Sequence, residues 1–174
     1  MLGPAADMQI LGLLGWSGSG KTTLLTRLLP LFVAHGLSVS TVKHAHSGFD
    51  LDQPGKDSFK HREAGAREVM IASGTRWALM HELAGPEPDL ATLLQRLSPV
   101  DLVLVEGFKS AGHPKLEVYR AGLGEAPFWP DRADVVAVAS DIALPACDRP
   151  VLPLDGTKVI ADWCLGFLGL AGHV

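Results

Sequence analysis

Eight residues close to the N-terminus, 15–22, fit the pattern G-x-x-x-x-G-K-[ST], which cradles phosphate groups in nucleotide-binding proteins. The glycines let the backbone curl so that its N–H groups point inward at phosphate oxygens. Lys21 would reach the β- and γ-phosphates, and the Thr22 hydroxyl would hold Mg²⁺. The pattern therefore predicts a nucleotide site formed by Gly15, Ser17, Gly18, Ser19, Gly20, Lys21, Thr22 and Thr23.

The residues on either side of this loop supply the context that a phosphate site needs. An apolar run over 10–14 precedes the loop and is typical of a β-strand, and apolar residues recur behind it at helical spacing. A helix that begins at Lys21 would add the partial positive charge of its N-terminus. The alternative is a glycine-rich turn that binds nothing, and the Lys-Thr pair argues against it.

A carboxylate at the end of a buried strand is the next candidate for chemistry. Residues 102–105 are apolar, as in a parallel strand buried on both faces, and Glu106 follows them. Ligands of parallel sheets bind beyond the carboxyl ends of the strands, so Asp101 lies at the wrong end, about 16 Å away. We expect Glu106 to hold the metal's water shell or to orient an attacking water. A Glu that merely ends the strand is the alternative.

A polar loop with three aspartates follows the strand predicted over 38–43. In proteins with this phosphate-binding loop, the corresponding segment often lies over the γ-phosphate and Mg²⁺. Asp52 is therefore a candidate metal ligand, and Asp52 and Asp57 are candidates for orienting water. Solvation and turn formation are the alternative roles of these two residues and of Asp50.

Basic residues cluster in the same part of the chain and predict a pocket for a second phosphorylated ligand. The cluster comprises Lys56, Lys60, His61, Arg62 and Arg67, with Lys109 and Lys115 expected near the end of the strand at 102–105. A solvated charged face is the alternative. His44 and His46 are too few for a zinc site, so anion contact or hydrogen bonding is the better interpretation. The candidates for the second ligand are Lys43, His44, Lys56, Arg62 and Lys109.

One residue is a candidate for recognising the nucleotide base. Asp141 follows a strand predicted over 135–139 and so lies at the ligand side of the sheet. Its carboxylate could accept hydrogen bonds from N1–H and N2–H₂ of guanine. An N-cap or turn residue ahead of Pro145 is the alternative.

Composition narrows the class of protein. The chain has 174 residues, of which 47% are hydrophobic, and this suits a single nucleotide-binding domain over 1–174. A net charge of −4 argues against nucleic acid or a membrane surface as the partner. The two cysteines give neither a metal spacing nor a disulfide framework. We expect a cytoplasmic protein without a signal peptide or membrane span.

Strands and helices alternate along most of the chain, which predicts an α/β fold with three layers and a mostly parallel sheet. Two strand-like runs over 68–73 and 76–82 flank Gly74-Thr75 and predict a hairpin. We expect this hairpin and a strand over 115–119 to be antiparallel additions at an edge of the sheet. Helices are predicted over 21–35, 58–64, 89–97 and 157–170.

Taken in order, these blocks resemble the molybdopterin-guanine dinucleotide biosynthesis protein B family (MobB), a group of GTP-binding P-loop proteins. The resemblance covers most of the chain, although 112–132 and the last helix match loosely. Its most specific parts are Asp-Gln-Pro-Gly-Lys-Asp-Ser at 52–58 and Val-Glu-Gly-Phe-Lys at 105–109. The other matching segments are 16–25, 43–46, 64–66, 76–80 and 136–141.

The resemblance implies GTP as ligand with Mg²⁺, a weak GTPase activity, a homodimer and the P-loop NTPase fold. It also implies an adapter role beside a guanylyltransferase of the MobA type, which attaches GMP to molybdopterin. From the residues alone, two other functions stay open. One is a self-sufficient ATP-dependent kinase or ligase. The other is a metallochaperone GTPase, which the lack of a Cys/His cluster disfavours.

Overall fold

The computed structural model describes residues 8–45 and 48–172, and its central feature is a six-stranded sheet in the order β2-β5-β1-β6-β7-β8. Every neighbouring pair in this sheet is parallel. All six strands therefore end at the same edge, where ligands of such sheets bind. In sequence order the strands are β1 (Gln9–Leu14), β2 (Val39–Lys43), β5 (Leu102–Glu106), β6 (Lys115–Tyr119), β7 (Val135–Ser140) and β8 (Val151–Pro153).

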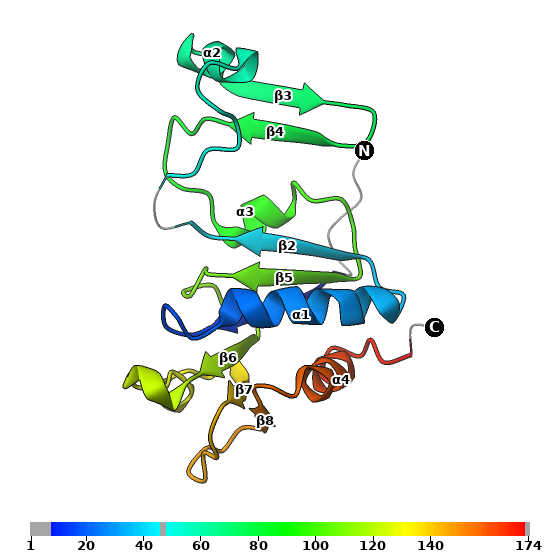
Figure 1. The fold of residues 1–174 in the computed structure, drawn as a ribbon, viewed down its shortest axis with the longest axis vertical. Coiled ribbons are helices and arrows are strands. Elements are labelled where there is room, and N and C mark those ends of the chain that lie inside the picture. The colour runs from blue at the N-terminus through cyan, green and yellow to red at the C-terminus, as the bar shows by residue number, and fades with distance from the viewer. Residues whose placement is uncertain (1–7, 46–47, 173–174) are drawn as a thin grey trace. The chain divides into compact units, whose positions relative to one another are not determined.

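Helices cover both faces of this sheet, as Figure 1 shows for α1 (Lys21–Ala34), α3 (Leu90–Leu94) and α4 (Thr157–Phe167). Helices α1 and α4 pack against each other on one face. Because side chains alternate along a strand, Leu102 and Leu104 join the core under α1 and α4, whereas Val103 and Val105 join the core under α3. The result is the expected three-layer arrangement.

The chain forms two compact units, of which one comprises 1–44 and 90–174 and contains the central sheet. The other spans Ala45–Asp89 and holds α2 (Asp57–Glu63), β3 (Glu68–Ala72) and β4 (Trp77–His81). Strands β3 and β4 pair antiparallel as a two-stranded sheet, and α2 packs against β3. The single domain expected over 1–174 stays a prediction.

The structure confirms the α/β fold but corrects the expected place of two elements. Strand β6 is not an antiparallel edge strand, because it lies between β1 and β7 and is parallel to both. The hairpin forms, but as a sheet of its own rather than as an addition to the main one.

Several boundaries also differ from the expected ones. Helix α3 has only five residues, α4 ends at Phe167, and strand β8 was not expected. Between β6 and β7 the chain forms two short 3₁₀ turns, η1 (Ala121–Leu123) and η2 (Trp129–Asp131). Among the described residues, no helix is long and apolar enough to cross a membrane.

Candidate functional site

The loop between β1 and α1 has the curled backbone that phosphate binding requires. Gly20 is the N-cap of α1 with φ 97°, a left-handed conformation that favours glycine, and Gly18 has φ 79°. A Cβ at Gly15 would lie 2.6 Å from both the Ser19 Oγ and the Val118 carbonyl oxygen. Gly15 therefore lies too close to Ser19 of the loop and to β6 to carry a side chain. Its N–H groups sit at the positive end of a 14-residue helix.

Two polar groups of this loop indicate that it fits an anion. The Ser19 Oγ is buried, and no described residue is its hydrogen-bond partner. The Lys21 ammonium donates to the carbonyl oxygens of Gly15 (3.0 Å) and Trp16 (2.7 Å), so its charge is held over the loop. Burial lowers the pKa of the Lys21 ammonium. The nearby charges of Lys109 and Lys43 lower this pKa further, whereas the negative charge of Glu106 raises it. A phosphate would supply the negative charge that this ammonium lacks.

Beside the loop, Thr22 and Glu106 form a pair of oxygen ligands. The Thr22 hydroxyl lies 2.9 and 3.0 Å from the two carboxylate oxygens of Glu106, which ends the neighbouring strand β5. The Lys43 ammonium lies 4.0 Å from Glu106 Oε1. A hydroxyl and a carboxylate suit Mg²⁺, which keeps several waters and takes its other ligands from substrate phosphates. The donor set thus fits this ion, whose charge would polarise phosphate oxygens when bound.

The turn after Glu106 is unusually constrained. Gly107 has φ 96° and Phe108 has φ 48°, which is uncommon for a residue with a side chain. A Cβ at Gly107 would lie only 2.5 Å from the Cβ of His44. The His44 and Phe108 rings pack at a centroid distance of 4.8 Å. His44 therefore packs against the turn that follows Glu106. Its expected contact with the second ligand stays a prediction.

An aromatic pair forms the other flank of the phosphate loop. Trp16 stacks on Phe128 with ring centroids 4.9 Å apart, and its indole N–H donates to the Ala126 carbonyl at 2.8 Å. The Lys109 ammonium lies 5.4 Å from the centre of each ring. These contacts attach the segment between β6 and β7 to the loop. They also place a cation over an aromatic surface next to the phosphate site.

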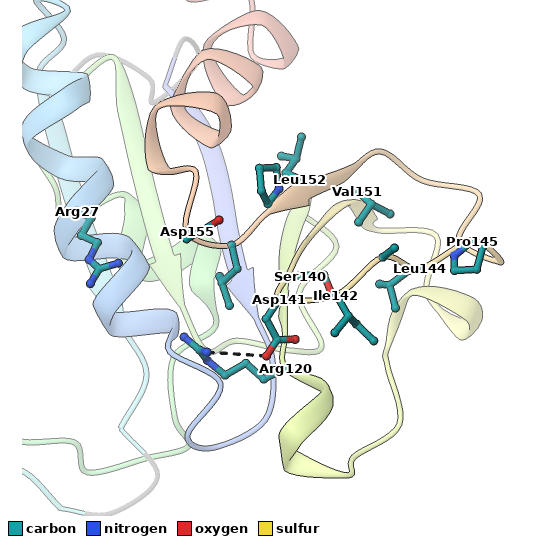
Figure 2. A pocket seen from close by; sticks show the side chains of 13 residues that line it. Arg27, Arg120, Ser140, Asp141, Ile142, Leu144, Pro145, Val151, Leu152 and Asp155 are labelled. Carbon is teal, nitrogen blue, oxygen red and sulfur yellow. Dashed lines mark hydrogen bonds and ion pairs between the residues drawn. The ribbon is translucent and has the colours of Figure 1, made fainter.

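Beyond the ends of β6, β7 and β8 lies a cavity of about 720 Å³ (Figure 2). Its charged lining residues are Arg27 of α1, Arg120, Asp141 and Asp155. The Asp141 carboxylate accepts a hydrogen bond from the Ala121 N–H at 3.1 Å. The apolar residues that line the cavity include Ile142, Leu144, Val151, Leu152 and Leu154. A mostly apolar cavity with a few converging charges is typical of a small-molecule site.

The remaining candidates lie in the unit at 45–89. Arg62 pairs with Asp50 (2.9 Å) and Asp52 (3.0 Å), and the Asp52 side chain is only 2% exposed. The second carboxylate oxygen of Asp52 has no hydrogen-bond partner among the described residues. Asp57 opens α2 and accepts a hydrogen bond from Lys60 at 3.1 Å, while Lys56 is the N-cap. The catalytic roles of Asp52 and Asp57, the metal-binding role of Asp52, and the ligand contacts of Lys56 and Arg62 stay predictions. His46 lies outside the described residues.

The expectation that Lys115 belongs to an accessible basic cluster is wrong. Lys115 is 1% exposed, and its ammonium donates to Asp134 at 2.7 Å, to the His113 carbonyl at 3.0 Å and to the Ala111 carbonyl. Arg132 also donates to Asp134, and together the two cations hold the pKa of that carboxyl far below its usual range. Lys115 therefore stabilises the strand rather than facing a ligand.

Sequence reasoning missed the residues that join the parts of the site, chiefly Arg120, Trp16 and Phe128. Arg120 directly follows β6. Because ligands bind beyond the carboxyl ends of parallel strands, a prediction that placed β6 within the parallel sheet would have indicated Arg120 as a site residue. No local pattern indicates that Phe128 stacks on Trp16, because 112 residues separate them in the sequence.

Comparison with known proteins agrees with this geometry. The family described as "Molybdopterin guanine dinucleotide synthesis protein B" matches residues 10–141. The chain belongs to the MobB family. A "Molybdopterin-guanine dinucleotide biosynthesis adapter protein" of Escherichia coli K12 is 42% identical over 166 residues, which cover 92% of this chain and 94% of the relative. One of the same description from Haemophilus influenzae is 40% identical and covers 93% of this chain and 90% of its own.

Solved MobB structures have the same fold. A crystal structure of Bacillus subtilis MobB superposes with a TM-score of 0.73 at 26% identity and covers 92% of this chain and 98% of its own. A structure described as molybdopterin-guanine biosynthesis protein B superposes with a TM-score of 0.69 at 30% identity, and covers 91% and 99%. The P-loop fold predicted from the sequence is thus confirmed.

Proposed function

We propose that this MobB-family chain binds GTP with Mg²⁺ and acts as an adapter in the attachment of GMP to molybdopterin. A guanylyltransferase of the MobA type would carry out the transfer itself. The observation that carries the proposal is the row of groups at the strand ends. Strands β2, β5, β1, β6 and β7 are consecutive in the sheet. Lys43 and Glu106 are the last residues of β2 and β5, and the phosphate loop, Arg120 and Asp141 directly follow β1, β6 and β7.

This order matches the order of parts in a nucleotide. The candidate metal ligand Glu106, at the end of β5, lies beside the loop that follows β1 and contacts Thr22. The cavity lies on the other side of that loop, beyond β6, β7 and β8. Phosphates over the loop would thus have Mg²⁺ on one side and the nucleoside in the cavity on the other. In the cavity, the Asp141 carboxylate would accept from N1–H and N2–H₂ of guanine.

Hydrolysis by the chain alone should be slow. Thr22 and Glu106 can hold the metal, but no other carboxylate of the described residues contacts them. Asp52 and Asp57 are our candidates for orienting water, and both lie in the unit at 45–89. We expect turnover well below the ~10 s⁻¹ median of enzymes, since an adapter has no need of fast hydrolysis.

Lys109 supports a role with molybdopterin. Its ammonium lies above the Trp16–Phe128 pair, so a planar ring with a phosphate could meet an aromatic surface and a cation together. Lys43 adds a second exposed cation beside Glu106. Molybdopterin, the MobA-type partner and the cytoplasmic location stay predictions.

The hairpin supports a homodimer. Met70, Leu79 and Trp77 lie on the same face of the β3–β4 sheet and are 63%, 43% and 66% exposed. Val69 on the other face is only 7% exposed. Apolar faces of this kind usually mark an interaction surface, and a two-stranded sheet is marginally stable by itself. Analytical ultracentrifugation of Trp77→Lys beside the wild type tests whether this face joins two copies.

The first test is calorimetric titration with GTP and ATP, with and without Mg²⁺, and then with molybdopterin. We expect GTP to bind and Lys21→Ala to abolish binding, because Lys21 is the cation that the loop holds over its carbonyl groups. Lys158→Ala is the matched control, since Lys158 is 80% exposed on α4 and pairs only with Asp162 among the described residues. Unchanged GTP affinity in folded Lys21→Ala would refute the phosphate site. Partner-free phosphoryl transfer from ATP to a metabolite would favour the kinase alternative.

The second test concerns the base. Asp141→Asn replaces an acceptor by an NH₂ donor that faces the guanine amine. A mismatched buried polar contact costs about 1–3 kcal/mol, so GTP should bind roughly tenfold more weakly. Xanthine has a carbonyl where guanine has this amine, so XTP should gain relative to GTP. An unchanged ratio of GTP to XTP affinity would mean that Asp141 does not recognise the base.

A further inference from the structure

Arg120 joins the phosphate loop to the cavity. It directly follows β6, and its Nε–H donates to the Ser19 carbonyl of the loop at 2.9 Å. The guanidinium lies beside the N-cap of α1, where a Cβ added at Gly20 would be 3.5 Å from Nη2. The same side chain lines the cavity beyond β7 and β8 (Figure 2). One residue thus touches the part of the site for phosphate and the part for the nucleoside.

Arg120 also faces Asp141 across a gap. The Arg120 Nη1 lies 3.9 Å from Asp141 Oδ2, which is an ion pair but too long for a hydrogen bond. Among the described residues, the guanidinium donates to the loop through Nε, and its Nη groups have no hydrogen-bond acceptor. The Asp141 carboxylate has about four acceptor positions, and the Ala121 N–H takes one of them. A charged donor and a charged acceptor thus lie next to each other on the cavity wall.

This pair matches the hydrogen-bonding edge of guanine. Along that edge an acceptor, O6, is followed by two donors, N1–H and N2–H₂. We propose that Arg120 donates to guanine O6 while Asp141 accepts from N1–H and N2–H₂, so that Arg120 is a specificity-determining residue. Adenine has a donor in place of O6 and an acceptor at N1, so both contacts would be mismatched. The proposal rests on the GTP binding proposed above and adds a second residue that recognises the base.

Two nucleotide analogues distinguish the proposed contacts of Arg120 and Asp141 in the wild-type protein. 6-Thio-GTP retains N1–H and N2–H₂ but offers sulfur, a weak and bulky acceptor, in place of O6. ITP retains O6 and N1–H but lacks the amine. By calorimetry with Mg²⁺ we expect each analogue to bind at least about fivefold more weakly than GTP, the lower end of the penalty for an unmet polar contact. Equal affinity for GTP and 6-thio-GTP would overturn the proposal.

Arg120→Met then assigns the O6 contact to its residue. We expect the preference for GTP over 6-thio-GTP to disappear in this variant, while the preference for GTP over ITP, which belongs to Asp141, persists. Arg96→Met is the matched control, because Arg96 is exposed and lies on the chain that leads into the start of β5, away from the strand ends. Both preferences should be unchanged there.

The outcomes also separate this proposal from the one on which it rests. If Arg120→Met weakens GTP, ITP and 6-thio-GTP by the same factor, Arg120 only ties the loop to β6 and the base-reading role is refuted. If the wild type binds GTP but Arg120→Met leaves every affinity ratio unchanged, this inference fails and GTP binding stands. If the wild type binds no nucleotide at all, the proposed function fails and this inference falls with it.

Discussion

Replacing Gly107 by alanine tests the construction of the metal side of the site. Gly107 has φ 96°, and a side chain in this left-handed region costs about 1–2 kcal/mol. The new Cβ would also lie 2.5 Å from the Cβ of His44, so the backbone of one residue or the other must shift. Such overpacking costs about 1–3 kcal/mol. Together we expect a loss of about 2–5 kcal/mol in the free energy of unfolding.

Urea unfolding of Gly107→Ala and of a control variant, Gly112→Ala, measures this loss. Gly112 belongs to the same stretch between β5 and β6, but a Cβ there meets no atom within 4 Å. We therefore expect the control to stay within about 1 kcal/mol of the wild type, or to be slightly more stable because its unfolded chain has less freedom. The difference between the two variants isolates the contact with His44 and the backbone strain.

The same substitution should weaken the dependence of nucleotide binding on Mg²⁺. Gly107 directly follows Glu106, whose carboxylate lies 2.9 Å from the Thr22 hydroxyl, so a shifted turn separates the two ligands. A titration of GTP binding against Mg²⁺ concentration measures this effect. The reasoning is refuted if Gly107→Ala unfolds at the same urea concentration as Gly112→Ala.

Two further perturbations follow from the same geometry. Glu106→Gln should retain GTP binding but slow hydrolysis or raise the Mg²⁺ concentration required, because it removes the charge beside Thr22; identical turnover and Mg²⁺ titration would leave Glu106 as a strand-end residue. His113→Met should flatten the pH dependence of stability, since burial, with help from Lys115, lowers the pKa of His113 to about 4. Below pH ~6.5 the His113 side chain of the unfolded chain binds a proton, whereas the folded chain does not bind it until about pH 4. The free energy of unfolding of the wild type should therefore fall by about 2–3 kcal/mol over this interval. Parallel wild-type and variant curves from urea unfolding at pH 4.5 and 7 would contradict this.

Local sequence patterns were sufficient to place the glycine-rich loop after β1 and Glu106 at the end of β5. Both depend on residues adjacent in the chain: a strand, a glycine-rich turn and a helix in one case, and a strand followed by a carboxylate in the other. Parallel strands end at a common edge, so the predicted proximity of Thr22 and Glu106 required only that β1 and β5 be neighbours. That pairing could not be derived from the sequence, but residues 10–14 and 102–105 are continuous apolar runs, as in central parallel strands.

The place of β6 could not be predicted in this way, because its sequence alternates charged and apolar residues as a half-exposed strand does. Lys115 and Glu117 are nevertheless each 1% exposed. Lys115 is neutralised by Asp134, and the Glu117 carboxylate accepts the N–H groups of Phe128 and Trp129, both at 2.8 Å. Burial still raises the pKa of Glu117 against these two bonds. The partners lie 11 to 19 residues further along the chain, where no periodicity indicates them.

The failure to predict Arg120 has the same cause. Placed on an edge strand, Arg120 would be a surface residue far from the phosphate loop. Because β6 lies between β1 and β7, the residue that follows it must emerge between the loop after β1 and Asp141 after β7. Its contacts with Ser19 and Asp141 follow from this position. The charges of β6 can be buried in the centre of the sheet because Asp134 and the N–H groups of Phe128 and Trp129 pair with them. That central position places the Arg120 guanidinium between the phosphate loop and the cavity.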